Sequence, residues 1–235
     1  MPGLYLRGAL VELIPTALIP VPNIIIFQYN PETMVHTWAQ PEAPKPGPTE
    51  AKGNPLAVEG TPGESFSFTI SMDSNDTIAD GQFTAGLAEV SGVYSRLSAL
   101  EMLLYPSQAA GGALLGAVSS AVGSLLGGGG GGVKRTVPSS AIPTCLFIWG
   151  PFRIVPVRVT GLTITERLYD AALNPVHAEA QLGLRVMTPD ELAHDTDTLA
   201  PIAKAAYTYT MGVRQAGAIA NLANAAESVV GMLPL

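Results

Sequence analysis

Apolar and polar residues alternate strictly along one segment of the chain, from Val176 to Val186. The apolar positions are Val176, Ala178, Ala180, Leu182, Leu184 and Val186, and the positions between them are His177, Glu179, Gln181, Gly183 and Arg185. Successive side chains of a strand point to opposite faces, so the pattern predicts an antiparallel strand with one buried face and one polar face. The polar face holds no group of residues suited to catalysis, which indicates a structural framework.

A change of phase interrupts the apolar pattern in the preceding segment, which runs from Cys145 to a turn at Asn174-Pro175. Val155, Val157 and Val159 share one parity, whereas Leu162 and Ile164 share the other. A β-bulge at Gly161 would return the later residues to the core face. Bulges bend strands, so the pattern predicts a bent sheet that closes into a barrel.

Other segments predict further strands and one packed helix. Ser65–Asp73 alternates, with Phe66, Phe68, Ile70 and Met72 on one face, and Ile24–Phe27 is β-branched and aromatic. Asp73–Asp76 predicts a turn. Apolar residues at three- and four-residue steps predict a helix over 85–105 that packs on the sheet and stops at Pro106.

The composition favours a protein that hides much of its surface in an assembly. The 235 residues are 47% hydrophobic and only 13% charged, below the roughly 25% of an average soluble domain. A low content of charge suits a subunit that is covered by partners on several sides. The net charge of -7 argues against a nucleic-acid-binding surface, which needs clusters of Lys and Arg.

Cys145 is the only cysteine, so no intrachain disulfide is possible and a reducing compartment is expected. Its apolar surroundings predict a small core residue rather than a reactive thiol. Glu12 and Pro15 interrupt the apolar N-terminal segment, which argues against a signal peptide. We therefore expect cytoplasmic synthesis and assembly.

Two long segments predict loops, and the C-terminus predicts helices. Residues 39–63 are rich in proline, and residues 106–140 form an insertion rich in alanine and glycine. Pro189 with two acidic residues predicts a helix start, and residues 198–232 predict one or two helices, divided near Gly212 or Gly217. The expected domains are 1–188, a β domain, and 189–235, a helical extension.

Residues 102–133 carry no charge. Their glycine content makes them a poor membrane span, and a flexible insertion is the favoured interpretation. A cell-envelope or membrane binding module that acts through 102–133 is the alternative function.

The sequence offers little evidence for chemistry. His36, His177 and His194 lie far apart, and no second histidine stands four residues from His194 as a zinc helix requires. The glycine run 127–132 is not followed by the Lys-Ser/Thr pair of a phosphate-binding loop. No catalytic, cofactor or metal site is predicted, although residues brought together by folding keep a hydrolase as a third hypothesis. Trp149 is expected to be a packing anchor, with a sugar-stacking platform as the alternative.

Four segments in order resemble one family, the tube and baseplate adaptor proteins of contractile injection systems. They are Phe27–Thr33 (FQYNPET), the helix from Val93 to Tyr105 followed by Pro106, the strand Phe147–Gly150 (FIWG), and the paired strands 159–164 and 174–179 with the turn NPVHAE. His177 stands where the family tends to have Arg, and an Ala-rich helical segment stands where adaptor members often have a LysM-type domain. The resemblance implies a phage tail-tube-like fold: an antiparallel barrel or pair of sheets, one packed helix and, here, a C-terminal helical extension.

The resemblance also implies a function without catalysis. The expected protein is a structural subunit that forms or caps a hexameric ring at the inner-tube/baseplate junction of a contractile injection system or phage-like tail. Its expected partners are further copies of itself and the inner-tube, spike or hub, and baseplate proteins, with no nucleic acid and no membrane. His177, Glu179, Gln181 and Arg185 become candidates for a lumen or inter-subunit face.

Overall fold

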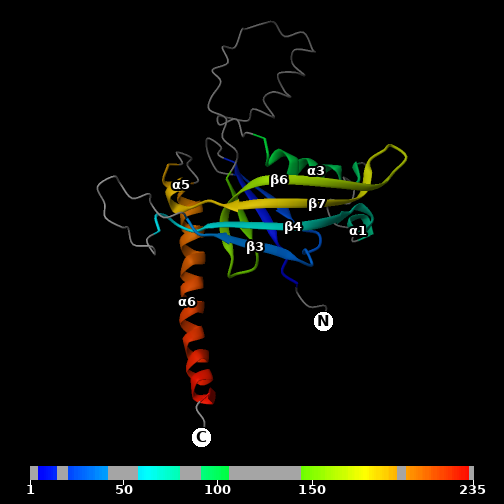
Figure 1. The fold of residues 1–235 in the computed structure, drawn as a ribbon. Helices are drawn as coiled ribbons and strands as arrows, with labels where there is room; N and C mark the ends of the chain where they lie inside the picture. The colour runs from blue at the N-terminus through cyan, green and yellow to red at the C-terminus, as the bar shows by residue number, and fades with distance from the viewer. Residues whose placement is uncertain are drawn as a thin grey trace, which may run out of the picture.

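The computed structural model describes residues 5–14, 21–41, 58–79, 91–105, 144–194 and 200–232. They form an α+β fold built on a seven-stranded antiparallel sheet (Figure 1). The strands are β1 (Ala9–Ile14), β2 (Val21–Ile26), β3 (Met34–Ala39), β4 (Gly63–Asp73), β5 (Cys145–Ile148), β6 (Ile154–Tyr169) and β7 (Pro175–Val186). The helices are α1 (Ser74–Ala79), α3 (Tyr94–Met102), α5 (Pro189–Ala193) and α6 (Ala200–Met232). The strand order is β2-β1-β5-β6-β7-β4-β3.

Strand β6 joins the two halves of the sheet. Residues 154–157 pair with β5, and the strand from Val157 onward pairs with β7. The register shifts between Val159 and Gly161, so Thr160 is the extra residue of a bulge. The predicted bulge is therefore confirmed.

The bulge has the predicted consequence for side-chain direction. Leu162 lies opposite Leu182, and Ile164 lies opposite Ala180. Both β6 residues are packed against the main core, on the same side as the valines that precede the bulge. The apolar face of β6 thus stays on one side of the sheet although its sequence parity changes.

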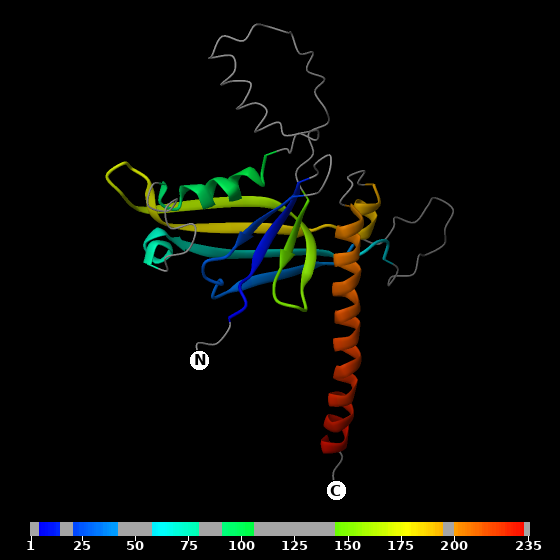
Figure 2. The ribbon, with the colours of Figure 1, turned by 180° about the vertical axis from the view of Figure 1, so that it is seen from behind.

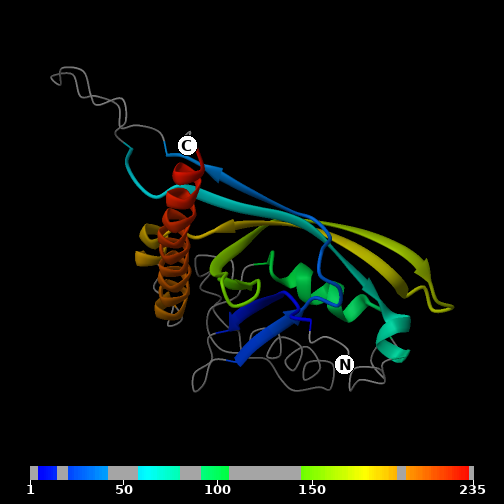
Figure 3. The same cartoon turned by 90° about the horizontal axis from the view of Figure 1, so that it is seen from below.

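The predicted closure into a barrel is not confirmed. Strands β2 and β3 are the two edges, and within the described residues each pairs with one neighbour only. The sheet instead bends over itself, so that β1 and β2 lie across from β4 and β7 with α3 on the inner side of the bend (Figure 3). The bend at β6 brings the two halves face to face without joining their edges.

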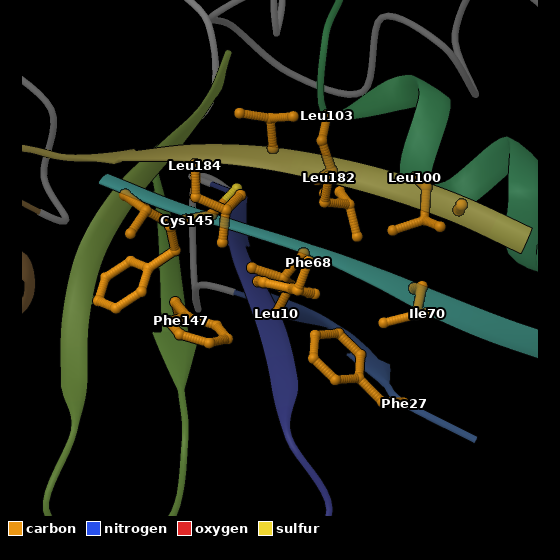
Figure 4. Packing of buried hydrophobic residues seen from close by; sticks show 14 of the residues in the cluster. Leu10, Phe27, Phe68, Ile70, Leu100, Leu103, Cys145, Phe147, Leu182 and Leu184 are labelled. Carbon is orange, nitrogen blue, oxygen red and sulfur yellow. The ribbon is translucent and has the colours of Figure 1, made fainter. Parts of the chain in front are cut away.

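One hydrophobic core fills the inside of this bend, as Figure 4 shows. It takes side chains from both halves of the sheet and from α3. The members labelled in the figure are Leu10, Phe27, Phe68, Ile70, Leu100, Leu103, Cys145, Phe147, Leu182 and Leu184. The Phe68 ring stacks on Phe147 with centroids 5.5 Å apart and lies 5.5 Å from the Phe27 ring. The alternation predicted for β4 and β7 is confirmed, because their apolar positions from residue 66 and residue 178 onward are buried.

Several local predictions need correction. The helix predicted over 85–105 lies partly outside the described residues, and α3 itself begins only at Tyr94. The reason is Gly92, whose φ of +56° interrupts a right-handed helix. Residues 74–76 belong to α1 rather than to a turn, and β3 was not predicted. The insertion 106–140 and most of the loop 39–63 lie outside the described residues.

Of the one or two helices predicted over residues 198–232, the structure shows one, α6, within the C-terminal extension. Helix α6 passes through Gly212 and Gly217 without interruption. Its first half packs on β6, and Figures 1 and 2 show its second half extending past the sheet. The start predicted at Pro189 is confirmed in α5, where Thr188 and Glu191 form a capping box.

Candidate functional site

The loop Phe27–Asn30, which carries the most distinctive motif of the sequence, holds distant segments together. The Gln28 amide donates to the Asp73 carbonyl (2.8 Å) and accepts from the Asp73 backbone amide (3.0 Å). Its oxygen also accepts from the Arg96 guanidinium of α3 (2.6 Å). One side chain therefore joins the β2–β3 loop, the end of β4 and α3.

Asn30 and Tyr29 extend the same function. The Asn30 side chain accepts from the Gly8 amide (2.9 Å) and donates to the Leu6 carbonyl (2.8 Å), which fixes the chain entering β1. The Tyr29 hydroxyl donates to Asp76 at the start of α1. This hydrogen bond, with partial burial and the nearby negative charges of Asp76 and Asp73, raises the pKa of Tyr29 to about 12. The motif thus acts as a structural clip.

A second cluster lies where α6 meets the sheet. Glu64 has the same parity as the buried phenylalanines of β4 and is only 4% exposed. Its carboxylate accepts two hydrogen bonds from Arg214 of α6 (2.9 and 2.5 Å) and lies 2.7 Å from His36 Nε2. A buried carboxylate needs such partners, since an unpaired buried charge is strongly unfavourable.

Aromatic rings surround this cluster. The Arg214 guanidinium lies 4.7 Å from the centre of the Trp38 ring, and His36 stacks on Phe66 at 4.3 Å. The Arg153 guanidinium lies over the same Phe66 ring, 5.3 Å from its centre. Burial lowers the pKa of Arg153, and the nearby Glu64 opposes that change. The cluster is a packed ionic anchor for α6.

Each of the three histidines has a different partner, on a different part of the fold. His36 contacts Glu64, His177 lies 3.4 Å from Asp73, and His194 contacts the Asp190 carbonyl within its own helix. Across the part of the chain that the structure describes, no group of three or more metal-binding side chains is assembled.

Cys145 is fully buried in the main core, as predicted. Burial, with a smaller contribution from Glu12, raises the pKa of its thiol to about 12. Such a thiol is not activated as a nucleophile. Trp149 packs against the core and stacks on Phe147 at 6.1 Å, which agrees with the predicted packing role.

The outer face of the sheet is polar and rich in hydroxyl groups. The pairing of β6, β7 and β4 aligns Thr163, Gln181 and Thr69 in one row, and Thr165, Glu179 and Ser71 in the next. A depression of about 450 Å³ begins on this face and is bounded by the loop 29–33. The predicted face residues His177, Glu179, Gln181 and Arg185 therefore share one surface. The alternation of Ser65–Asp73 predicts the polar side of β4, but not its pairing with β7 on this surface.

The uncharged segment 102–133 is described only as far as Tyr105, and its remainder lies outside the described residues. Among the helices that the structure does describe, none combines the length and apolarity needed to cross a bilayer.

Comparison with models of protein families yields no match, and a search of curated proteins yields no significant relative.

Proposed function

We propose that this protein is a non-enzymatic structural subunit that forms or caps a hexameric ring at the inner-tube/baseplate junction of a contractile injection system or phage-like tail. The ordered set of sequence segments supports this proposal, together with what those segments do in the fold. The loop Phe27–Asn30 joins distant segments by hydrogen bonds, Trp149 packs against the core, and the bulge at Thr160 bends the sheet. Each of these features holds or bends the fold, as expected of a structural subunit of an assembly.

The observation that carries the proposal is the open sheet with its two edges. Strands β2 and β3 each have one paired side among the described residues, and unpaired edges are templates for further strands. Both edges also present large apolar side chains, with Ile24 and Ile26 on β2, and Val35 and Trp38 on β3. Contacts between unlike edges of successive copies are heterologous, and such contacts make a ring when the rotation closes.

The polar outer face suits the same arrangement. In the proposed ring, the sheets of neighbouring copies complete the barrel that one copy leaves open, and the rows of Thr, Ser and Gln face the lumen. Its charges include both signs, for example Arg167 and Glu179, which pair at 3.5 Å. The inner-tube, spike or hub, and baseplate proteins are the proposed neighbours along the axis.

Electron microscopy of the purified protein and of particles that contain it tests the proposal. We expect six-fold rings of the protein and its presence at the tube/baseplate junction. An Ile24→Lys variant places a charge on the β2 edge and should weaken ring formation, whereas Thr163→Lys on an interior strand of the same sheet is the matched control. Absence of the protein from tube and baseplate, or equal effects of the two lysines, would contradict the proposal.

A further inference from the structure

The tip of the β6–β7 hairpin combines exposed leucines with an uncommon backbone. Leu168 and Leu173 have φ values of +56° and +64°, and in the described chain they are the only residues other than glycine with positive φ. Their side chains are 71% and 78% exposed, and Tyr169 beside them is also exposed. A left-handed conformation costs roughly 1–2 kcal/mol for a residue with a side chain. These leucines add nothing to the core that would offset this cost.

Asp170 holds the tip in this conformation. Its Oδ1 accepts from the backbone amides of Ala172 and Asn174, each at 2.8 Å, and its Oδ2 accepts from the Asn174 side chain at 2.9 Å. Backbone bonds between Asp170 and Asn174 (3.0 Å) and between Leu173 and Asp170 (3.1 Å) complete the turn. The leucines are therefore presented on an ordered turn, and order before binding lowers the entropy lost when a partner is bound.

A second uncovered apolar surface lies on α6. The first half of the helix is anchored by the buried residues Ala200, Ala203, Ala206 and Thr210 and by Arg214. Beyond Arg214, every residue from 215 to 222 is exposed, and none carries a charge. Ile219 and Leu222 are each 67% exposed. Among the described elements, none covers the apolar side chains of residues 215–222, which we call the free half of α6.

The two surfaces lie at opposite ends of the molecule. In Figures 1 and 3, the hairpin projects from one end of the long strands, and α6 stands at the other. One copy therefore cannot bring its own hairpin tip to its own helix. A contact between them must therefore join two copies. When it is not reciprocal, it has the head-to-tail geometry that makes a ring if the rotation closes.

We propose that the hairpin tip of one copy, formed by Leu168, Tyr169 and Leu173, packs against residues 215–222 of α6 in the next copy. This inference rests on the proposed ring and names a contact that holds it together. The uncharged helix segment lets the leucines be buried without an unpaired charge. Near the tip the acidic residues Glu166 and Asp170 outnumber the one basic residue, Arg167, and with the net charge of -7 they disfavour an anionic membrane as the occupant instead.

Disulfide trapping between two differently labelled variants tests the contact. One variant carries Leu173→Cys and the other Ile219→Cys, and each keeps the buried native Cys145. The two proteins are mixed, assembled and oxidised. A disulfide between unlike copies then reports that the tip of one reaches the helix of another, and we expect the mixed dimer to be the main product.

A matched control uses Leu173→Cys with Ile202→Cys, an exposed position on the anchored half of α6. Cross-linking there as strong as at residue 219 would indicate random collision and would overturn the inference. Adding Asp170→Ala to the first variant loosens the turn and should reduce the yield several-fold. Circular dichroism verifies that each variant is folded.

The outcomes separate this inference from the proposed function. Rings of the unmodified protein without the 173–219 disulfide would overturn the hairpin contact and leave the ring intact. Absence of any ring in the unmodified protein would overturn both. A specific disulfide together with rings supports both.

Discussion

Arg214 of helix α6 forms a two-pronged ion pair with Glu64 of strand β4, across 150 residues of sequence. The two terminal guanidinium nitrogens each donate to a different carboxylate oxygen, Nη1 to Oε2 and Nη2 to Oε1, an arrangement that lysine cannot reproduce. The carboxylate is nearly inaccessible to water, whereas the arginine lies at the boundary of the sheet. The pair therefore fixes where α6 leaves the body of the protein, and so the direction of its free half.

Replacing Arg214 with Met should destabilise the fold strongly, because it leaves the Glu64 carboxylate buried with only His36 as a partner. Removal of one member of a buried pair costs about 3–5 kcal/mol. Urea unfolding followed by circular dichroism measures the loss. The double variant Glu64→Leu/Arg214→Met removes both charges and should recover most of the stability, and a double variant as weak as the single one would show that the charge is not the cause.

Gly92 should tolerate no side chain. A Cβ there would stand 2.2 Å from the Pro175 carbonyl oxygen, and its φ is positive. The neighbouring Val93 amide donates to that same carbonyl (2.9 Å), so the close approach attaches α3 to β7. We expect Gly92→Ala to cost at least about 2 kcal/mol in the free energy of unfolding.

Gly161→Ala is the matched control for Gly92, because a Cβ at Gly161 meets nothing within 4 Å. Its thermal midpoint should stay near that of the unmodified protein. Similar losses at the two glycines would mean that the close approach of Gly92 to Pro175 is not what the fold depends on.

Gln28→Ala should remove the side-chain hydrogen bonds that join the β2–β3 loop, the end of β4 and α3. It removes the acceptor for Arg96 and for the Asp73 amide and the donor to the Asp73 carbonyl. Loss of such partly buried hydrogen bonds costs about 1–3 kcal/mol, or roughly 2–4 °C in Tm for each kcal/mol at this chain length. Differential scanning calorimetry measures it. The exposed Gln40, which follows β3, provides the control, since Gln40→Ala should leave Tm unchanged.

Much of the sheet follows from alternation alone. Strands β4 and β7 are long enough for their parity to be unambiguous, and the phase change around Gly161 is a direct sequence signal for the bulge in β6. Extending the β4 alternation by one step places Glu64 on the core face, so its burial also has a sequence signal. Its partner Arg214 follows no spacing rule, because the pair forms only when α6 docks.

Edges and ends of elements were the least predictable parts. Strand β3 is short and mixes polar with aromatic residues, and its pairing with β4 is visible only in the fold. Helix α6 continues through Gly212 and Gly217, each of which costs only about 1 kcal/mol relative to alanine. The uncommon conformations of Leu168 and Leu173 have no sequence signature, since leucine rarely adopts them.

The Cys145 thiol should not react with thiol reagents in the folded protein. Its side chain is fully buried, and burial raises the pKa of the thiol to about 12. Dithiobis-nitrobenzoate should react at neutral pH only after denaturant is added, and the reaction rate then reports unfolding. Rapid reaction of the native protein would show that the core around β5 opens far more often than its packing implies.

Tyr29 should make stability depend on pH at the alkaline end. Its pKa rises from 10.0 to about 12 in the fold, chiefly through the hydrogen bond to Asp76, so the folded protein holds the phenolic proton more tightly than the unfolded chain does. The stabilisation is complete below pH 10 and is lost as the pH rises toward 12. Tyr29→Phe should flatten this part of the stability profile and remove one late-titrating phenol from the tyrosinate absorbance curve. Because the side chain is partly exposed, solvent screening keeps the effect modest.

Asp76→Asn provides the complementary test for Tyr29. It should return the Tyr29 pKa toward 10, and an unchanged titration would mean that Asp76 is not the cause of the shift.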